Sequence, residues 1–143
     1  HFKRINDNYG HKVGDLVLKE ITQVLEKCSR YSTDLPARIG GEEFLVILPN
    51  TDVDGAKAVT ERLLRTVYDL NIPHAASEYE RVTLSAGLAV KHADDNKTID
   101  YVMLEADKNL YVAKTSGRNQ LVAPTAVSAG KINAPSHPTK LKA

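Results

Sequence analysis

The sequence predicts an α+β fold in which helices pack on a mixed, mainly antiparallel central sheet. Two patterns lead to this class: segments with helical apolar spacing alternate with short strand-like segments, and a glycine pair joins two apolar runs. The composition agrees, because 42% hydrophobic and 26% charged residues are typical of a globular chain. At 143 residues the chain suits one domain with a single core.

The first part of the chain predicts two helices. Residues 2–8 suit a short helix that breaks at Gly10. A longer helix is expected to begin near Gly14 and Asp15, where the carboxylate could cap unpaired backbone amides. Its apolar residues recur at mostly helical spacing, namely Leu16, Leu18, Ile21, Val24, Leu25 and Cys28.

A hairpin follows, with strands predicted at residues 35–39 and 44–48. The tightest hairpin turns need positive φ at both central residues, so Gly40 and Gly41 are predicted to form the turn. Because neighbouring strand residues point to opposite faces, Glu42 and Glu43 are not expected to share one environment. An open turn with two acids could hold Mg²⁺ and admit phosphate oxygens, or it could simply be a solvated turn.

The second half predicts two more helices and two strands. Asp52 or Asp54 opens a helix, and Thr98 or Asp100 opens another that ends by Gly117. Residues 81–90 are β-branched and loosely alternating, as in a strand, and residues 120–122 suit a last short strand.

The charge distribution separates a domain, residues 1–122, from a tail, residues 123–143. The tail carries Lys131, Lys140 and Lys142 without any acid, lacks apolar periodicity and is expected to be disordered. The domain holds 16 basic and 18 acidic residues, a balance that argues against nucleic-acid binding.

Cysteine content and hydropathy bear on the compartment. The lone Cys28 cannot form an internal disulfide, and no apolar run reaches the roughly 20 residues that span a bilayer. We therefore expect a cytoplasmic domain, while membrane anchoring through other parts of a full-length protein stays open.

Four blocks of sequence, in this order, resemble one known family: residues 2–11, Gly14–Asp15, the hairpin residues 40–44, and residues 106–119. Together they are similar to the GGDEF family of diguanylate cyclases, in the variant whose hairpin reads Gly-Gly-Glu-Glu-Phe. The resemblance spans residues 1–122 and implies a sheet like that of nucleotide cyclases and polymerase palms. It also implies a central strand with an Asp-x-Asp motif just before the position of His1, so residues 1–122 are expected to be an N-terminally incomplete domain from a longer protein. If no such strand preceded His1, the sheet should be unstable, aggregation-prone or completed by another chain.

The resemblance implies an activity and its partners. Two GTP molecules would be joined into cyclic di-GMP with release of two pyrophosphates, across a homodimer with two Mg²⁺ or Mn²⁺ ions in each half-site. An upstream sensory or dimerisation module is also implied. By the same resemblance Glu42 is a metal ligand, and Glu43 lies beside the metals, where it is catalytic and itself a candidate ligand.

Six further residues match the substrate-binding positions of the family. Asn6 and Asp15 match the positions that read guanine; a polar helix residue and a helix N-cap are their alternative roles. The remaining matches are to phosphate-binding positions, namely Phe2, Lys3, Lys114 and Arg118. Lys114 and Arg118, four residues apart, are expected on one helix face, where they could instead offset the helix dipole.

One departure from the family concerns regulation. Many relatives carry an inhibitory Arg-x-x-Asp site for the cyclic product. Asp34 stands at the expected position, but Tyr31 replaces the arginine and Arg30 comes one residue too early. A tyrosine lacks the charged fork with which arginine binds phosphate, so we predict weak or absent product inhibition here.

Two other functions remain open at this stage. One is a catalytically silent domain that binds GTP or cyclic di-GMP and regulates a partner. The other is a different nucleotide cyclase or a polymerase-palm relative, because a fold does not fix a function.

Overall fold

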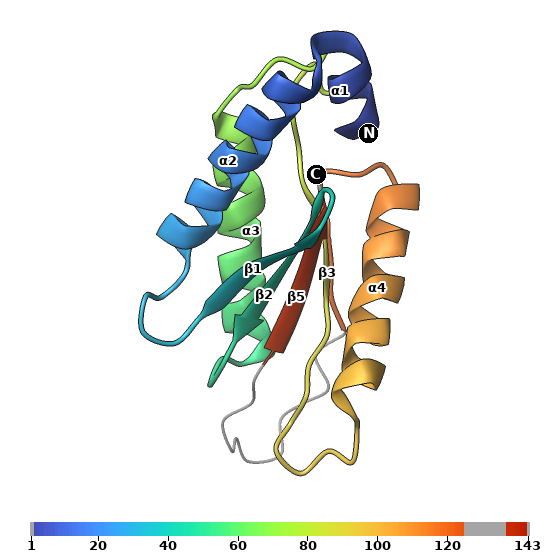
Figure 1. Ribbon diagram of the computed structural model, residues 1–143. Helices are drawn as coiled ribbons and strands as arrows, with labels where there is room; N and C mark the ends of the chain where they lie inside the picture. Colours follow the sequence, from blue (N-terminus) through green and yellow to red (C-terminus); the bar gives the residue numbers. More distant parts are fainter. Residues whose placement is uncertain (1, 125–136, 143) are drawn as a thin grey trace.

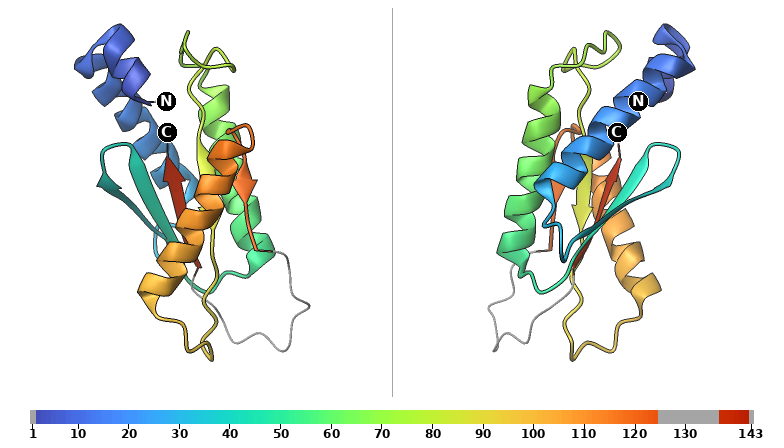
Figure 2. Two further views of the ribbon diagram at one scale, coloured as in Figure 1. Left: turned by 90° about the vertical axis from the view of Figure 1, so that its right-hand side faces the viewer. Right: turned by 60° about the vertical axis from the view of Figure 1, so that its left-hand side comes forward.

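The computed structural model describes residues 2–124 and 137–142. Its helices are α1 (Phe2–Tyr9), α2 (His11–Cys28), α3 (Val53–Asp69) and α4 (Ile99–Thr115). Its strands are β1 (Leu35–Gly40), β2 (Glu43–Leu48), β3 (Ser85–Leu88), β4 (Leu121–Val122) and β5 (His137–Lys142). The elements form three layers, with α2 and α3 on one face of the sheet and α4 on the other (Figure 1; Figure 2).

The strands form one five-stranded sheet in the order β1-β2-β5-β3-β4. The β1–β2, β2–β5 and β5–β3 pairs are antiparallel, and only β3–β4 is parallel. The predicted α+β class, with a mixed and mainly antiparallel sheet between helices, is therefore confirmed. The turn of the hairpin, the last turn of α4 and the end of β5 lie at the same edge of the sheet (Figure 1).

Helix starts follow the predicted caps in two cases and differ in one. Asp52 accepts a hydrogen bond from the Gly55 amide at 2.7 Å to open α3, and Thr98 accepts one from the Tyr101 amide at 3.2 Å to open α4. The expected cap at Asp15 is wrong, because α2 begins at His11, immediately after Gly10, which has a φ of 84°. Asp15 therefore lies inside the helix, and its carboxylate is not needed to cap it.

The predicted strand at residues 81–90 is shorter in the structure. Only Ser85–Leu88 forms β3, while Arg81 makes an isolated bridge with Pro73. All four β3 residues are buried, and a Cβ atom at Gly87 would overlap the α4 backbone at Ala106 and Leu110. Glycine therefore lets α4 lie directly on the sheet.

The prediction of a disordered tail is wrong for residues 137–142. Residues 137–142 form β5 at the centre of the sheet, whereas the sequence indicated disorder from residue 123 onward; residues 125–136 and 143 lie outside the described residues. β5 pairs with β2 through Glu43↔Lys142 and with β3 through Ser85↔Lys142. Leu141 and Thr139 are fully buried, so this short segment contributes to the core despite its polar composition.

The core lies between the sheet and helices α2 and α3. Its largest fully buried side chains include Phe44 and Leu48 from β2, Ile21 and Leu25 from α2, and Leu63 from α3. Each such side chain contributes about 1.5–3 kcal/mol through burial.

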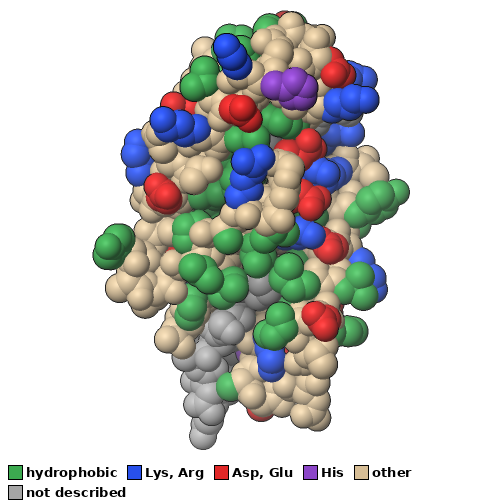
Figure 3. All heavy atoms as spheres, in the orientation of Figure 1, with side chains coloured by type: hydrophobic (Ala, Val, Ile, Leu, Met, Phe, Trp, Pro, Cys, Tyr) green, Lys and Arg blue, Asp and Glu red, His purple; other side chains and the backbone are tan. Residues whose placement is uncertain are grey.

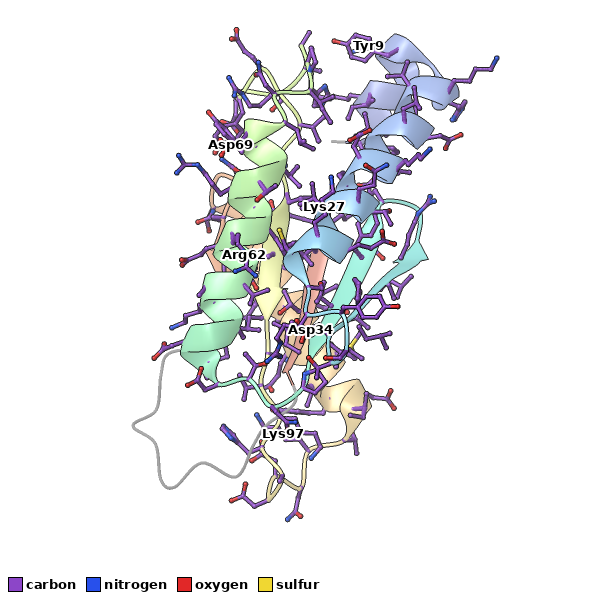
Figure 4. The ribbon with its side chains drawn as sticks, turned by 90° about the vertical axis from the view of Figure 1, so that its left-hand side faces the viewer. Tyr9, Lys27, Asp34, Arg62, Asp69 and Lys97 are labelled. Carbon is purple, nitrogen blue, oxygen red and sulfur yellow. The ribbon has the colours of Figure 1, made fainter. Side chains whose placement is uncertain are left out.

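A polar contact ties the end of α2 to α3. The Arg62 guanidinium donates to the Cys28 carbonyl at 2.7 Å. Figure 4 shows Arg62 on α3. Among the described residues, no helix combines the length and apolarity needed to cross a membrane.

Candidate functional site

The hairpin turn differs in detail from the predicted two-glycine turn. Gly41 has a φ of 47°, but Gly40 does not have positive φ and instead pairs with Glu43 at the end of the ladder. The turn is therefore centred on Gly41 and Glu42, one residue later than predicted. The Arg38 side chain steadies it by donating from Nε to the Gly41 carbonyl at 2.8 Å.

The two hairpin carboxylates converge, contrary to the expectation that they occupy separate environments. Lys142 Nζ lies 3.5 Å from Glu42 Oε1 and 3.4 Å from Glu43 Oε1. Strand alternation does not apply to this pair, because Glu42 belongs to the turn and only Glu43 to β2. The two acids therefore face one common cation position.

Lys114 belongs to the same cluster. It lies in the last turn of α4, where burial lowers the pKa of its ammonium and repulsion from Lys142 lowers it further, against the attraction of Glu43 and Glu42. Burial alone would also lower the pKa of Lys142, but the two glutamates outweigh burial and raise it. The fold thus brings three predicted site residues, Glu42, Glu43 and Lys114, together around Lys142.

Arg118 does not share a helix face with Lys114, so that prediction is wrong. Helix α4 ends at Thr115, Gly117 has a φ of 110°, and Arg118 has a φ of 61°. The Arg118 amide donates to the Ala113 carbonyl at 2.9 Å, which closes the helix end. Tyr79 Oη donates to the Gly117 carbonyl at 2.7 Å and so fixes the segment that carries Arg118.

Arg118 and Phe2 instead both line a pocket of about 200 Å³. Phe2 is buried at the start of α1 and lines this pocket, while the Lys3 side chain is exposed. His74 also lines it; this side chain is 4% exposed, and neither ring nitrogen has a hydrogen-bond partner in the described part of the chain. Nothing in the sequence around His74, a single histidine in a loop, indicated this position.

The guanine-reading candidates lie at the junction of α1 and α2. Asn6 is half-buried, and a Cβ atom at Gly14 would overlap its Oδ1 atom, so glycine allows the two helices to approach. Asp15 follows Gly14 in α2 and is exposed. The two side chains are therefore carried on adjoining helical turns, and their proposed role in reading guanine stays a prediction.

Asp34 is fully engaged by Arg30, outside the hairpin cluster. It accepts hydrogen bonds from the Arg30 backbone amide at 2.8 Å and from the guanidinium Nε at 2.9 Å and Nη2 at 2.7 Å. The Asp34 side chain is 0% exposed, below the end of α2 in Figure 4. Tyr31, at the position where relatives place an arginine, is fully exposed to solvent.

The donor set at the hairpin fits a hard divalent cation only in part. Two carboxylates face one cation, the Lys142 ammonium, and oxygen ligands are those that Mg²⁺ prefers. Among the described residues, no group of three or more His, Cys, Asp or Glu side chains could surround a metal. An ion here would therefore take its remaining ligands from water, substrate phosphates or residues beyond those described. In the view of Figure 3, charged side chains of both signs gather over the upper part of the molecule.

The family of this chain is shown by a match to a family model. Residues 1–120 match the family model described as "Diguanylate cyclase, GGDEF domain". The chain belongs to the GGDEF family. In this GGDEF domain the hairpin residues read Gly40-Gly41-Glu42-Glu43-Phe44.

Curated proteins similar to this chain are named as diguanylate cyclases. The domain is 40% identical over 120 residues to diguanylate cyclase A of Treponema denticola, covering 84% of this chain and 32% of that protein. It is 42% identical over 122 residues to diguanylate cyclase DgcM of Escherichia coli K12, covering 85% of this chain and 28% of that protein. The chain thus spans about a third of the length of these relatives.

Solved structures agree as well. The coiled-coil and GGDEF domain structure of DgcB from Caulobacter crescentus, in complex with c-di-GMP, matches with a TM-score of 0.77 and 28% identity, covering 87% of this chain and 64% of that one. The active GGEEF domain of a diguanylate cyclase from Vibrio cholerae matches with a TM-score of 0.73 and 30% identity, covering 89% and 78%.

Proposed function

We propose that this GGDEF domain condenses two GTP molecules into cyclic di-GMP and two pyrophosphates. The observation that carries the proposal is the convergence of Glu42 and Glu43 on one cation position beside Lys114. Carboxylates that share a cation can hold a divalent ion, and a neighbouring ammonium can bind phosphate. Family membership and the names of the relatives support the same activity.

In this proposal the hairpin residues hold the reacting phosphate region. Glu42 and Glu43 would hold two Mg²⁺ or Mn²⁺ ions in each half-site, with Glu43 beside the reacting atoms, where it stabilises developing charge or assists deprotonation of the attacking hydroxyl. Bound divalent ions neutralise charge on the phosphates and make a hydroxyl more acidic. In each half-reaction the 3′-oxygen of one nucleotide bonds to the α-phosphorus of the other. The bond from that α-phosphorus to the bridging oxygen of the β-phosphate breaks, and pyrophosphate leaves.

The remaining candidates position the nucleotide. Asn6 and Asp15 would read the guanine edge from the α1–α2 junction. The backbone amides at Phe2 and Lys3 would face the triphosphate, and Lys114 and Arg118 would bind its oxygens from the end of α4. The positions of Phe2 and Arg118 around one pocket support this arrangement.

A homodimer follows from the stoichiometry of the product. One domain that binds one GTP supplies half of a molecule that contains two nucleotides, so two domains must face each other. Holding both reactants in line replaces a bimolecular encounter with a pre-arranged one. An upstream sensory or dimerisation module, as the lengths of the relatives suggest, would control how often the two halves meet.

Product identification tests the proposal. The protein is incubated with Mg²⁺ and either GTP or ATP, and the products are separated and weighed by mass spectrometry. We expect cyclic di-GMP and pyrophosphate from GTP alone. GTP binding without any product would instead identify a silent nucleotide-binding domain, and a product from ATP would identify a different nucleotide cyclase.

A further inference from the structure

The segment that follows α4 has an unusual backbone conformation. Gly117, Arg118 and Asn119 have φ values of 110°, 61° and 45°, so three consecutive residues occupy the region of positive φ. Glycine adopts this region freely and asparagine tolerates it, but for a residue such as arginine the conformation is strained. A strained backbone persists only where the surrounding structure holds it in place. The bonds that hold this segment therefore also decide the direction of the Arg118 side chain.

Local hydrogen bonds hold one side of the segment. The Arg118 amide donates to the Ala113 carbonyl at 2.9 Å. Gln120 Nε2 donates to the Ala113 carbonyl at 3.1 Å and to the Ser116 carbonyl at 2.7 Å. These bonds satisfy carbonyls at the end of α4 that have no partner within the helix. They close the helix but leave the Gly117 carbonyl to another donor.

Tyr79 supplies that donor from a loop 38 residues earlier in the chain, and its hydroxyl donates to the Gly117 carbonyl at 2.7 Å. The loop is itself closed by backbone hydrogen bonds. The His74 amide donates to the Glu80 carbonyl, and the Glu80 amide donates to the Ser77 carbonyl, each at 3.0 Å. A closed loop holds Tyr79 in a fixed position, so its hydroxyl anchors the backbone one residue before Arg118.

The Arg118 side chain is left free for a ligand. It is half-buried and lines the pocket of about 200 Å³ together with Phe2 and Tyr79. Among the residues that the structure describes, no hydrogen bond or ion pair engages its guanidinium. The Arg30 guanidinium, in contrast, is occupied by Asp34. A guanidinium binds phosphate oxygens through a rigid fork, so its strength as a ligand depends on direction as well as on charge.

We propose that Tyr79 is a positioning residue for the substrate, which fixes Arg118 in the direction that binds phosphate oxygens. The inference rests on the proposed function, since it takes Arg118 as a phosphate-binding residue. Without the Tyr79 hydroxyl, the Gly117 carbonyl loses this bond and the strained backbone at Arg118 relaxes. Only the fraction of molecules that keeps the original conformation then binds phosphate well, so the apparent affinity falls with that fraction.

The test measures binding of inorganic pyrophosphate by isothermal titration calorimetry, because pyrophosphate carries phosphate groups without the base. In Tyr79→Phe, which removes only the hydroxyl, we expect binding about tenfold weaker than in wild type, as when about a tenth of the molecules keep Arg118 in place. Binding of guanosine, which lacks phosphate, should not change. With GTP as substrate, KM should rise by a similar factor while kcat stays within about twofold, because saturating substrate selects the competent conformation.

Tyr9→Phe is the matched control. Tyr9 Oη accepts a hydrogen bond from the Ala75 amide at 3.2 Å, so this variant also removes a tyrosine hydroxyl that contacts the same loop. It leaves the bond to Gly117 in place, and we expect wild-type affinity for pyrophosphate. Equal weakening in Tyr9→Phe and Tyr79→Phe would overturn the inference, because it would indicate a general loosening of the loop.

A double-mutant cycle shows whether Tyr79 acts through Arg118. Arg118→Gln removes the charge at similar side-chain length, and it should weaken pyrophosphate binding by itself. In the Arg118→Gln background, Tyr79→Phe should have no further effect. The same loss from Tyr79→Phe in both backgrounds would mean that the Tyr79 hydroxyl contacts the ligand itself, and positioning would be overturned.

The remaining outcomes separate the inference from the proposed function. Unchanged pyrophosphate affinity in Tyr79→Phe, with affinity lost in Arg118→Gln, would overturn the inference and leave Arg118 as a phosphate-binding residue. Unchanged affinity in Arg118→Gln, or no pyrophosphate binding by wild type, would overturn the proposed role of Arg118 and the inference with it. Cyclic di-GMP production from GTP by wild type tests the proposed function independently of these affinities.

Discussion

Two acidic sites lie at opposite ends of β1, and they differ in how their carboxylates are satisfied. Asp34, just before β1, has a side chain that is 0% exposed and that accepts three hydrogen bonds from Arg30 at 2.7–2.9 Å. Glu42 and Glu43, just after β1, are 24% and 37% exposed and share one ammonium at 3.4–3.5 Å. A carboxylate whose acceptors are satisfied in the buried state stabilises the fold, whereas partly exposed carboxylates keep acceptor capacity for a ligand.

The network around Asp34 extends beyond Arg30. The same guanidinium donates to Thr51 Oγ1 at 2.6 Å and to the Pro49 carbonyl at 3.0 Å, which ties the end of α2 to the segment between β2 and α3. An arginine used in this way has few donors left for a phosphate. We therefore interpret Arg30–Asp34 as a structural ion pair, an interpretation consistent with the prediction that product inhibition through this site is weak or absent.

The hairpin acids give the largest expected effect on activity. In Glu43→Gln we expect turnover to fall about 10²–10³-fold or more, since an electrostatic group at the reacting phosphates is lost. The free energy of unfolding should change by less than about 0.5 kcal/mol, because this long and partly exposed ion pair contributes little to stability. Cyclic di-GMP synthesis and urea denaturation measure the two quantities. Glu26→Gln, at an exposed position of α2, is the control, and near-wild-type synthesis in Glu43→Gln would remove the assigned role.

Substitution of Asp34 should change the stability of the fold more than that of Glu43 does. In Asp34→Asn we expect the free energy of unfolding to fall by about 2–3 kcal/mol, because charge-assisted hydrogen bonds to a buried acceptor are weakened. Asp69→Asn is a matched control, since Asp69 also pairs with an arginine four residues away but is 58% exposed. Its cost should stay below about 0.5 kcal/mol. Equal costs for the two variants in urea denaturation would contradict the distinction between the sites.

A smaller effect is expected on how steeply the stability of the fold declines at low pH. Burial alone would raise the pKa of Asp34, but hydrogen bonds from the Arg30 side chain and backbone outweigh burial and hold it below the ordinary 3.8. The unfolded state then binds more protons, so the contribution of Asp34 is present above pH 3.8 and is lost as the pH falls below it. Thermal melts at decreasing pH should show a shallower acid loss in Asp34→Asn than in wild type. Parallel curves would refute the depressed pKa.

The smallest expected effect concerns Tyr31. Restoring the family's pattern with Tyr31→Arg should leave inhibition by cyclic di-GMP unchanged, because Asp34 is buried and already bound by Arg30. Product titration of wild type and variant, each at fixed GTP, measures this. Tight inhibition that appears in Tyr31→Arg would show that Asp34 can leave Arg30, and the structural interpretation of the pair would then be wrong.

Local signals predicted many of the elements correctly. Asp52 and Thr98 cap their helices as predicted, and the glycine pair does mark a hairpin, because caps and turns depend on a few neighbouring residues. Predictions that needed finer geometry failed: Asp15 lies within α2, and Arg118 lies beyond the end of α4. In both cases a glycine with positive φ, Gly10 or Gly117, decides where the helix begins or ends.

By itself, the sequence determined the fold class, the acidic hairpin and the residues proposed to bind nucleotide. The tertiary structure alone decided that Glu42 and Glu43 face one cation, that His74 is buried at a pocket, and that residues 137–142 complete the sheet. The physical reason is the range of the interactions. Caps and periodicity act within a few residues, whereas Lys142 pairs with Glu43 only because a sheet brings distant segments together, and its polar surroundings in the sequence give no sign of that contact.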